Sequence, residues 1–299
     1  MASRALVLGG GGPVGIAWES GLLAGLAKAG VNLGDADFIM GTSAGSFVGM
    51  RLAFGAETAT MADPILAERP AAPASGERSA GAPNSAPADL APLMRLMGEA
   101  QGGTRDPAEV RREIGAFALS AKTMSEDDFI ASFGRTMAGL PANAWPPKAY
   151  ACTAVDALTG EFQLWTGAAG IGVGRAVASS CSVPGVYPPV TIKGRRYIDG
   201  GMRSGTNADQ ATGHEKVVVV ALRLGGGTEV GNRIAARLDE EIASLKAGGA
   251  EVRLVVPDEG SLAAMGVNLM DFRKRADAAK AGLAQGAGQA DGLRAFWNG

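Results

Sequence analysis

The sequence predicts an α/β fold in which short buried strands alternate with helices. The first 54 residues already show this order, because two apolar runs that end at glycine are each followed by a helical pattern. A further strand–helix–strand pattern, with apolar runs at 217–222 and 251–256, lies near the end of the chain. Strands joined by crossover helices lie parallel in one sheet, so we expect a central, mostly parallel sheet.

The beginning of the chain predicts two strands and two helices. Pro13 suits the first turn of a helix, because the N–H that proline lacks would have no partner there. Gly30 suits the end of that helix, and Ile16, Leu22 and Leu26 recur on one of its sides. We expect strand, helix, strand and helix, in this order, over 4–9, 13–29, 37–41 and 44–54.

A segment of low complexity interrupts this pattern, and we expect a mobile insertion over about residues 57–92. Between Pro70 and Pro92, 18 of 23 residues are Pro, Ala, Ser or Gly, and Leu90 is the one large aliphatic residue. Such a composition buries too little apolar surface to offset the entropy that ordering the chain would cost. The insertion could carry a lid, and the whole chain, 1–299, is expected to form a single domain.

The rest of the chain predicts further helices and two hairpins. Ser125 and Asp128 resemble a capping box at the start of a helix, with Asp in place of the usual Glu. Gly194 marks the turn of the second hairpin. In chain order we expect helices over 93–100, 107–119 and 125–137, a hairpin over 148–166, a helix over 175–181, a hairpin over 191–198, a strand over 217–222, a helix over 230–246, a strand over 251–256 and a helical tail from 271.

The composition excludes several classes of function. Lys and Arg number 28 against 30 Asp and Glu, the formal net charge is −2 and the pI is about 5.6, so no nucleic-acid partner is expected. One His and two Cys cannot build a His-rich zinc site, and we expect no metal and no cofactor. Cys152 and Cys181 are expected to be small buried residues in a reducing compartment.

No segment has the features of a targeting or membrane-spanning sequence. Five glycines between Leu8 and Trp18, followed by Glu19, take the place that the apolar region of a signal peptide would occupy. No run of 18 apolar residues occurs, so nothing is expected to span a membrane. We expect a cytoplasmic protein, for which peripheral contact with a membrane stays open.

Three glycine-containing motifs carry the functional signal. Gly10-Gly11-Gly12-Pro13-Val14-Gly15 follows the first predicted strand, Gly41-Thr42-Ser43-Ala44-Gly45 follows the second, and Asp199-Gly200-Gly201 ends the second hairpin. Because 45 of the 299 residues are glycine, each motif alone is weak evidence. Their occurrence together, each directly after a strand, is strong evidence for a common site.

The second motif has the form of a nucleophile elbow, in which a sharp strand-to-helix turn lifts the serine oxygen above the sheet. Gly41 and Gly45 suit that turn because side chains there would clash. A serine hydroxyl attacks a carbonyl only if a base removes its proton and hydrogen-bond donors stabilise the oxyanion that forms. Ser43 is the expected nucleophile, and the N–H groups of the Gly10–Gly12 backbone are the expected oxyanion hole.

The general base can be a carboxylate or a histidine. Asp199 can take the Ser43 proton directly, in a Ser–Asp dyad, if burial raises its pKa from the usual value of about 3.9. The chain order Ser43, Asp199, His214 also matches the triad of α/β-hydrolases. His214 lies in a polar turn before a strand, however, and only two strands precede Ser43, so the dyad is the favoured interpretation.

The first motif also matches the glycine pattern of dinucleotide-binding proteins, through Gly10, Gly12 and Gly15. The acid that binds the ribose should then end the second strand, whereas Asp35 and Asp37 precede that strand. No GK[ST] sequence occurs, which excludes a phosphate-binding P-loop. Dinucleotide binding is therefore not the favoured interpretation.

In these motifs and in their order, the sequence resembles the patatin-like phospholipases. The proline-bearing segment 178–189 also resembles the loop that precedes the acid in that family. The resemblance covers roughly 4–54 and 148–256. It implies a three-layer α/β/α fold with the nucleophile elbow after the second strand, a Ser43–Asp199 dyad, an oxyanion hole from the Gly10–Gly12 backbone, and hydrolysis of lipid acyl esters without a metal.

The sequence therefore predicts a serine acyl hydrolase of the phospholipase A or esterase type, whose substrate is a lipid or another acyl ester. Two alternatives stay open: a catalytically idle lipid-binding or regulatory module of the same fold, and a hydrolase with a His214 triad. Arg203 and Asn207 could brace the loop of the acid or meet the substrate, and the bracing role is the favoured interpretation. Met94 and Met97 lie in an apolar stretch that could touch lipid but suits a core-facing helix better.

Overall fold

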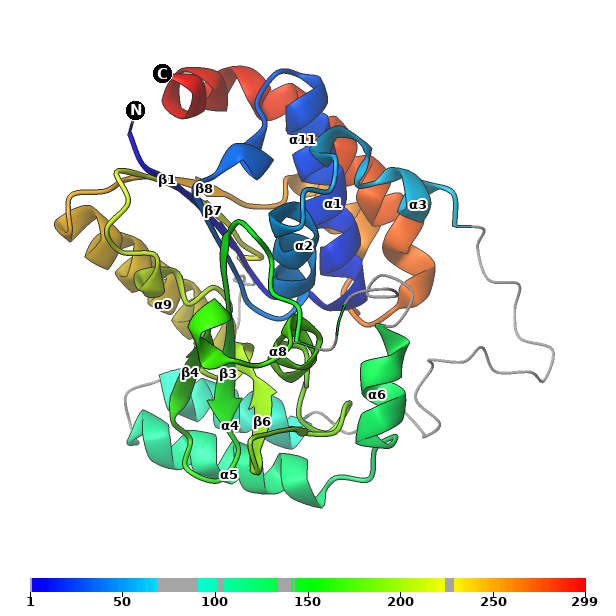
Figure 1. Cartoon of the computed structure of the whole chain (residues 1–299), viewed down its shortest axis with the longest axis vertical. Coiled ribbons are helices and arrows are strands. Elements are labelled where there is room, and N and C mark those ends of the chain that lie inside the picture. The colour runs from blue at the N-terminus through cyan, green and yellow to red at the C-terminus, as the bar shows by residue number, and fades with distance from the viewer. Residues whose placement is uncertain (1, 69–90, 102–104, 134–140, 142, 224–228) are drawn as a thin grey trace.

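Helices cover both faces of one central sheet, which gives the three-layer α/β/α arrangement that the sequence resemblance implies (Figure 1). The computed structural model describes residues 2–68, 91–101, 105–133, 141, 143–223 and 229–299. Its strands are β1 (Arg4–Leu8), β2 (Phe38–Gly41), β3 (Ala149–Asp156), β4 (Phe162–Trp165), β5 (Val190–Ile192), β6 (Arg195–Asp199), β7 (Lys216–Val220) and β8 (Glu251–Val255).

Over the described ranges the sheet has eight strands, in the order β5-β6-β3-β2-β1-β7-β8, and β4 pairs with β3 as well. The pairs among β3, β2, β1, β7 and β8 are parallel, whereas every pair that involves β4 or β6 is antiparallel. The sheet is therefore mostly parallel, as expected, and its antiparallel part comes from the two hairpins that the sequence predicts.

The helices follow the predicted order along the chain. They are α1 (Gly12–Lys28), α2 (Ala44–Ala53), α3 (Asp63–Leu66), α4 (Ala91–Gln101), α5 (Pro107–Ser120), α6 (Glu126–Ser132), α8 (Val173–Ser180), α9 (Glu229–Ala247), α10 (Glu259–Met265) and α11 (Arg275–Asn298). α3 and α10 are additional to the prediction, because one and two turns of helix are too short for an apolar period to stand out.

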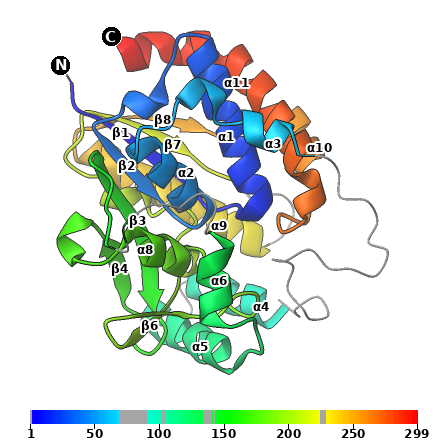
Figure 2. The ribbon, with the colours of Figure 1, turned by 45° about the vertical axis from the view of Figure 1, so that its right-hand side comes forward.

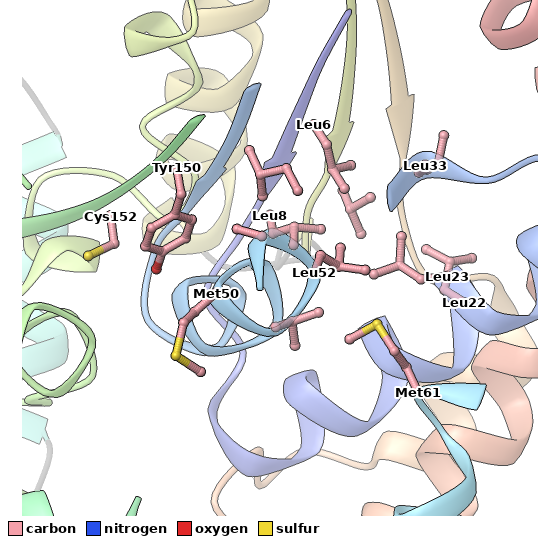
Figure 3. Packing of buried hydrophobic residues seen from close by; sticks show 14 of the residues in the cluster. Leu6, Leu8, Leu22, Leu23, Leu33, Met50, Leu52, Met61, Tyr150 and Cys152 are labelled. Carbon is pink, nitrogen blue, oxygen red and sulfur yellow. The ribbon is translucent and has the colours of Figure 1, made fainter. Parts of the chain in front are cut away.

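The alternation of side chains along the strands divides the core between the two faces of the sheet. Leu6 and Leu8 of β1 belong to the cluster that contains α1, α2, α8 and α11 (Figure 3). Ala5 and Val7 belong to the cluster with Leu238 of α9 on the other face. α4 and α5 extend this second layer over β3 and β6. Burial on both faces explains why the parallel strands are continuous apolar runs.

α1 and α11 pack with their backbones in close approach. A Cβ atom on Gly25 would lie 2.2 Å from the carbonyl oxygen of Leu283, and one on Gly286 would lie 2.2 Å from that of Leu22. Glycines on both helices therefore face each other, and the approach leaves no room for any side chain. This contact fixes the C-terminal helix over the face of the sheet that holds α1 and α2.

β2 and β6 meet end to end along one edge of β3. Gly41, the last residue of β2, pairs with Cys152, whereas Asp199, the last residue of β6, pairs with Ala154. β4 pairs with this same stretch of β3 and therefore occupies its other edge. β3 extends past β2 toward β6 (Figure 2). Because β2 and β6 run toward each other, their carboxyl ends converge beside Thr153.

Two expected boundaries change in the structure. The insertion expected from about residue 57 cannot begin before 69, because a 3-10 turn (Thr58–Thr60) and α3 occupy this stretch and bury Met61 and Ile65. The remainder of the expected insertion, 69–90, lies outside the described residues, and α4 follows it. The helix expected over 125–137 ends at Ser132, and residues 134–140 also lie outside the described part.

The capping box expected at the start of α6 forms in a modified way. The Asp128 N–H donates to Ser125 Oγ at 3.1 Å, as in a capping box. The Asp128 carboxylate, however, accepts a 2.6 Å hydrogen bond from the Ser125 hydroxyl and not from its backbone N–H. The side chain of Asp is one methylene shorter than that of Glu, which explains why the reciprocal bond is made to the nearer group.

We expect Gly25→Ala to destabilise the protein by about 2–3 kcal/mol, because the new methyl group forces α1 away from α11. Gly288→Ala is the matched control: it lies on α11 with no atom within 4 Å of an added Cβ. Alanine should stabilise the helix there by about 0.5–1 kcal/mol. Urea unfolding measures the free energy of unfolding of each variant. If both substitutions changed this free energy equally, the contact between α1 and α11 would be less close than described.

Candidate active site

Ser43 lies at the turn between β2 and α2, and its backbone is strained. Its φ of 53° and ψ of −118° are values that residues other than glycine seldom adopt. A Cβ on Gly41 would lie 2.3 Å from the carbonyl oxygen of Gly45, and one on Gly45 would lie 2.2 Å from that of Leu8. The sharp strand-to-helix turn expected from the sequence is therefore present, with glycine where no side chain fits.

The end of α8 holds the Ser43 backbone in this conformation. The Ser43 N–H donates to Ser180 Oγ at 2.9 Å, while the Ser43 carbonyl oxygen accepts from Ser46 Oγ at 2.6 Å and Cys181 Sγ at 3.2 Å. Burial raises the pKa of the Cys181 thiol, so it stays protonated and can donate. These contacts were not predicted; the available signal was the resemblance of segment 178–189 to a family loop.

Asp199 approaches Ser43 from the end of β6. Its side chain is buried and accepts the Gly201 N–H at Oδ1 over a distance of 2.7 Å. Asp199 and Ser43 line the same cavity. Burial raises the pKa of Asp199 to about 7, and the nearby Ser43 hydroxyl and the Gly201 N–H limit the rise. A carboxyl group with such a pKa can take up and release a proton near neutral pH.

The loop of glycines between β1 and α1 packs against Ser43. A Cβ on Gly10 would lie 3.5 Å from the Cβ of Ser43. Gly12 has a φ of 59°, and a Cβ there would lie 2.8 Å from the carbonyl oxygen of Leu269. The backbone at this position therefore both requires the left-handed region and excludes a side chain. The first motif is adjacent to the second in space, as expected.

The three glycines differ in the availability of their N–H groups. Gly10 donates its N–H to the carbonyl oxygen of Gly205 at 2.8 Å, so the expectation that it contributes to an oxyanion hole needs correction. Within the described part of the chain, the N–H groups of Gly11 and Gly12 have no such acceptor. Gly12 begins α1, where helix N–H groups lack intrahelical partners and the helix dipole favours negative charge.

An apolar cavity of about 240 Å³ opens beside Ser43 and Asp199. Met97 of α4 lines it, whereas its neighbour Leu96 is buried in the core. The expectation of a core-facing helix is therefore confirmed in part, and the side chain of Met94 lies outside the described part. The other large apolar residues that line the cavity are Val183, Met202, Leu222, Ile234, Leu238, Leu269 and Met270.

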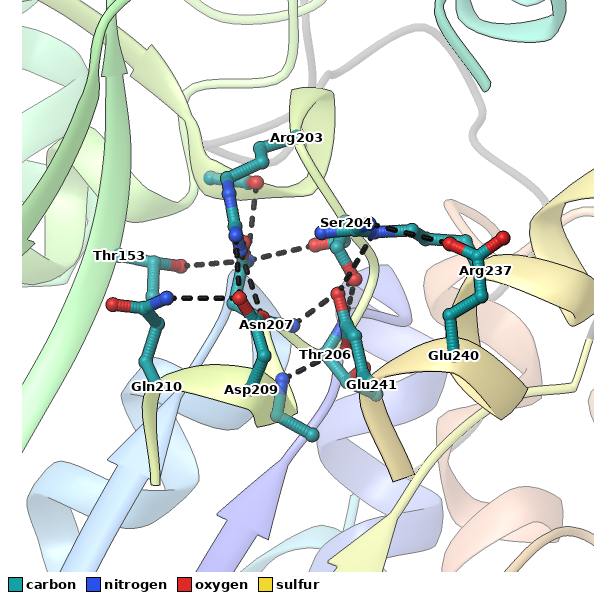
Figure 4. A network of polar contacts seen from close by, with 12 residues as sticks. Thr153, Arg203, Ser204, Thr206, Asn207, Asp209, Gln210, Arg237, Glu240 and Glu241 are labelled. Carbon is teal, nitrogen blue, oxygen red and sulfur yellow. Dashed lines mark hydrogen bonds and ion pairs between the residues drawn. The ribbon is translucent and has the colours of Figure 1, made fainter. Parts of the chain in front are cut away.

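Asn207 connects the elbow, the acid loop and β3 (Figure 4). Its Nδ2 lies within hydrogen-bond distance of four acceptors, whose distances are 3.1 Å (Thr42 Oγ1), 3.4 Å (Thr153 Oγ1), 3.2 Å (Gly200 O) and 2.8 Å (Ser204 O). Thr42 and Thr153 are themselves bonded through their hydroxyl groups at 2.8 Å. The prediction that Asn207 braces the acid loop is confirmed, and the loop is tied directly to the residue before Ser43.

Two charged groups support this network from outside. Arg203 Nη1 donates to Asn207 Oδ1 at 2.8 Å, and the same guanidinium binds the Asp209 carboxylate at 2.5 Å. The predicted bracing role of Arg203 is confirmed as well. Glu241 of α9 is buried and accepts from Thr206 Oγ1 at 2.7 Å, and burial raises its pKa. The acid loop is therefore fixed at both the Arg203 and the Thr206 positions.

His214 lies at the opposite end of the strands from Ser43. Its ring stacks on Phe38, the first residue of β2, with 5.2 Å between ring centroids, whereas Ser43 follows the last residue of that strand. Burial lowers the pKa of His214. The two side chains lie at opposite ends of β2, so His214 does not reach Ser43 and the alternative triad does not form in this structure.

The described residues hold no group of three or more His, Cys, Asp and Glu side chains arranged as a metal site. Cys152 and Cys181 are buried free thiols, as expected from the sequence. Among the helices that the structure describes, none has the length and apolar character needed to cross a bilayer.

Comparison with known proteins agrees with the motifs. The family model for patatin-like phospholipase matches residues 6–212, and the chain belongs to this family, whose members generally hydrolyse lipid esters. Among solved structures, VipD from Legionella pneumophila is similar with a TM-score of 0.48 and 15% identity, over 98% of this chain and 67% of that chain. The type III effector protein ExoU has a TM-score of 0.38 and 14% identity, over 97% and 53% of the two chains. A search of curated proteins gave no match.

We expect Asn207→Gly to slow the reaction of Ser43 with a fluorophosphonate by about 10- to 100-fold, because the elbow and the acid loop lose their shared donor. Glycine tolerates the φ of 50° at this position, so the substitution adds no backbone strain. Unfolding free energy should fall by about 1–3 kcal/mol from the lost buried hydrogen bonds.

The control for this prediction is Gln210→Ala, in the same loop, which loses a single hydrogen bond to Asp209. It should be labelled at the rate of the unsubstituted protein. If Asn207→Gly lost stability but kept its labelling rate under native conditions, Asn207 would be a structural residue without influence on Ser43.

Proposed function

We propose that this chain is a serine acyl hydrolase that cleaves carboxylic esters of lipids, with Ser43 as nucleophile and Asp199 as its base. The observation that carries the proposal is that Ser43 and the buried Asp199 carboxyl group line the same apolar cavity, where burial raises the pKa of Asp199 to about 7. Membership of a family that generally hydrolyses lipid esters supports it. The apolar lining of the cavity suits an acyl chain better than a polar substrate.

In the first half of the reaction, Ser43 Oγ attacks the ester carbonyl carbon while Asp199 accepts the hydroxyl proton. The carbonyl oxygen of the substrate becomes an oxyanion, which the free N–H groups of Gly11 and Gly12 stabilise at the positive end of α1. Asp199 then gives its proton to the leaving alcohol as the C–O bond breaks. The acyl group stays on Ser43 Oγ as an ester.

In the second half, a water molecule takes the place of the alcohol. Asp199 removes a proton from this water, and the water oxygen attacks the acyl carbon. The N–H groups of Gly11 and Gly12 stabilise the second oxyanion. The proton returns from Asp199 to Ser43 Oγ when the fatty acid leaves. One carboxyl group thus acts alternately as base and acid, which requires a pKa close to the pH of the reaction.

The Ser43→Ala variant tests this proposal, because it removes the nucleophile and leaves the cavity in place. We expect a fluorophosphonate probe to label the unsubstituted protein and not Ser43→Ala, and ester hydrolysis to fall by at least about 10⁴-fold. His214→Asn is the control and should keep the full rate, since His214 lies at the other end of β2.

Each other outcome has a defined meaning. Equal labelling of the protein and Ser43→Ala would disprove the nucleophile, and a large loss in His214→Asn would favour the triad. Binding of lipid vesicles without hydrolysis of any p-nitrophenyl ester would instead support a catalytically idle lipid-binding module.

The pH dependence of hydrolysis should follow the ionisation of Asp199. We expect kcat/KM for a soluble ester to be constant above about pH 7 and to fall about tenfold per pH unit below it, because the protonated carboxyl group cannot accept the Ser43 proton. A profile that is flat down to about pH 5 would contradict Asp199 as the base.

The contribution of Asp199 to the free energy of unfolding should decrease as the pH rises, whereas hydrolysis becomes faster. The folded protein binds the Asp199 proton more tightly than the unfolded chain, so this contribution to stability is complete at low pH and is lost as pH rises through about 7. Asp199→Asn has no such proton. We therefore expect its gain in unfolding free energy, relative to the unsubstituted protein, to be larger at pH 8 than at pH 4, although the variant is inactive.

A further inference from the structure

Large apolar side chains are exposed in one short segment, residues 262–274, which begins in the middle of α10 and continues into the loop after it. In the described parts of the chain, five large apolar side chains are well exposed, and Leu262, Val267 and Phe272 are three of them. Val267 is fully exposed, and about half of the surface of Leu262 and of Phe272 is exposed. Single exposed apolar residues are normal, whereas three within eleven positions concentrate exposed apolar surface in one segment.

The exposure of these side chains is built into an ordered loop. Gly266, with a φ of 68°, ends α10 by donating its N–H to the carbonyl oxygen of Leu262 at 3.0 Å. Asn268 Oδ1 then accepts the Met270 N–H at 3.0 Å, and Asp271 Oδ1 accepts the Arg273 N–H at 3.1 Å. Hydrogen bonds on both sides of Val267 therefore hold it outward.

The same loop forms part of the wall of the cavity beside Ser43. Leu269 and Met270 line that cavity, and the Leu269 carbonyl oxygen accepts the Val14 N–H at 3.2 Å, in the first turn of α1. The exposed side chains and the cavity wall thus belong to one continuous stretch of chain.

The charges of the loop fit a negatively charged partner. Residues 262–274 contain one acid, Asp271, and two bases, Arg273 and Lys274, and Arg275 follows directly. Asp271 pairs with Arg273 and Glu68 pairs with Arg275, and over the described ranges Lys274 has no ion-pair partner. The segment therefore has a formal net charge of +1, whereas the whole chain has a net charge of −2.

We infer that residues 262–274 dock onto the surface of an anionic lipid bilayer, with Val267 and Phe272 inserted among the headgroups and Lys274 beside them. Apolar side chains flanked by basic ones are the combination that binds such an interface. The inference rests on the proposed function, because a substrate delivered by the bilayer explains why the docking surface adjoins the cavity. A bilayer, unlike a folded partner, requires no groove opposite the three side chains.

Binding is best measured in the Ser43→Ala background, so that the vesicles stay intact and the result does not depend on hydrolysis. Vesicles of phosphatidylcholine and phosphatidylserine in a ratio of about 3:1 serve as the probe in a sedimentation assay. The double substitution Val267→Ser and Phe272→Ser should weaken binding about tenfold or more. Lys274→Gln should weaken binding to these vesicles by a few-fold and leave binding to pure phosphatidylcholine unchanged.

Leu158→Ser is the matched control, because Leu158 is more exposed than Phe272 but lies in the turn between β3 and β4. It should bind vesicles as well as the Ser43→Ala protein does. With Ser43 restored, the double variant should hydrolyse a soluble short-chain ester at the normal rate and lose activity on vesicle lipids. Thermal unfolding checks that all variants are folded.

Three results would overturn the inference: equal vesicle binding with and without the double substitution, an equal loss in Leu158→Ser, or a change from dimer to monomer in the double variant with vesicle binding unaltered. The last would identify the loop as a contact between two copies of the chain. If the unsubstituted protein hydrolysed no ester but the binding results held, the proposed function would fail and the docking surface would stand.

Discussion

The position of two strand ends on β3 determines the rest of the site. β2 and β6 share one edge of β3, run toward each other and stop two residues apart, at the partners of Gly41 and Asp199. The nucleophile candidate follows one end and the acid candidate forms the other. Their distance is therefore set by the hydrogen-bond register of the sheet and not by flexible loops, which is how a rigid scaffold keeps reactive groups in place.

This arrangement also explains why so many polar groups are buried behind Ser43. Where two strands end inside the protein, the peptide groups beyond them lose their sheet partners and must find others. The side chain of Asn207 supplies two of them, because its Nδ2 donates to the carbonyl oxygens of Gly200 and Ser204. The burial that makes these bonds necessary also raises the pKa of Asp199 to about 7. Burial therefore both brings the pKa of Asp199 near neutral pH and lowers the stability of the folded protein. The close packing of α1 on α11 and the core on both faces of the sheet compensate for this loss of stability.

Much of the fold and the shared location of Ser43 and Asp199 could be predicted because the signals are local. An apolar run, a glycine turn and a helical period lie within some 25 residues of one another, and Ser43 and Asp199 each stand directly at a strand end. What could not be predicted depends on pairs far apart in the chain. Asn207 and Thr42 are 165 positions apart, and Ser180 and Ser43 are 137 apart. Residue type alone does not reveal the partner of a backbone N–H, which is why the oxyanion role expected for Gly10 needed correction.

The hydrogen bond that removes Gly10 from the oxyanion hole has a role of its own. Its acceptor, Gly205, lies in the acid loop between Asp199 and Asn207, so the bond fastens that loop to the loop of glycines. On the other side, the carbonyl oxygen of Leu269 fastens the start of α1 to the loop that bears Val267. The N–H groups of Gly11 and Gly12 therefore lie between two attachments, one to the acid loop and one to the loop that bears the exposed Val267. The N–H groups that we propose as oxyanion donors are therefore positioned by two loop attachments, whereas the register of the sheet positions Ser43.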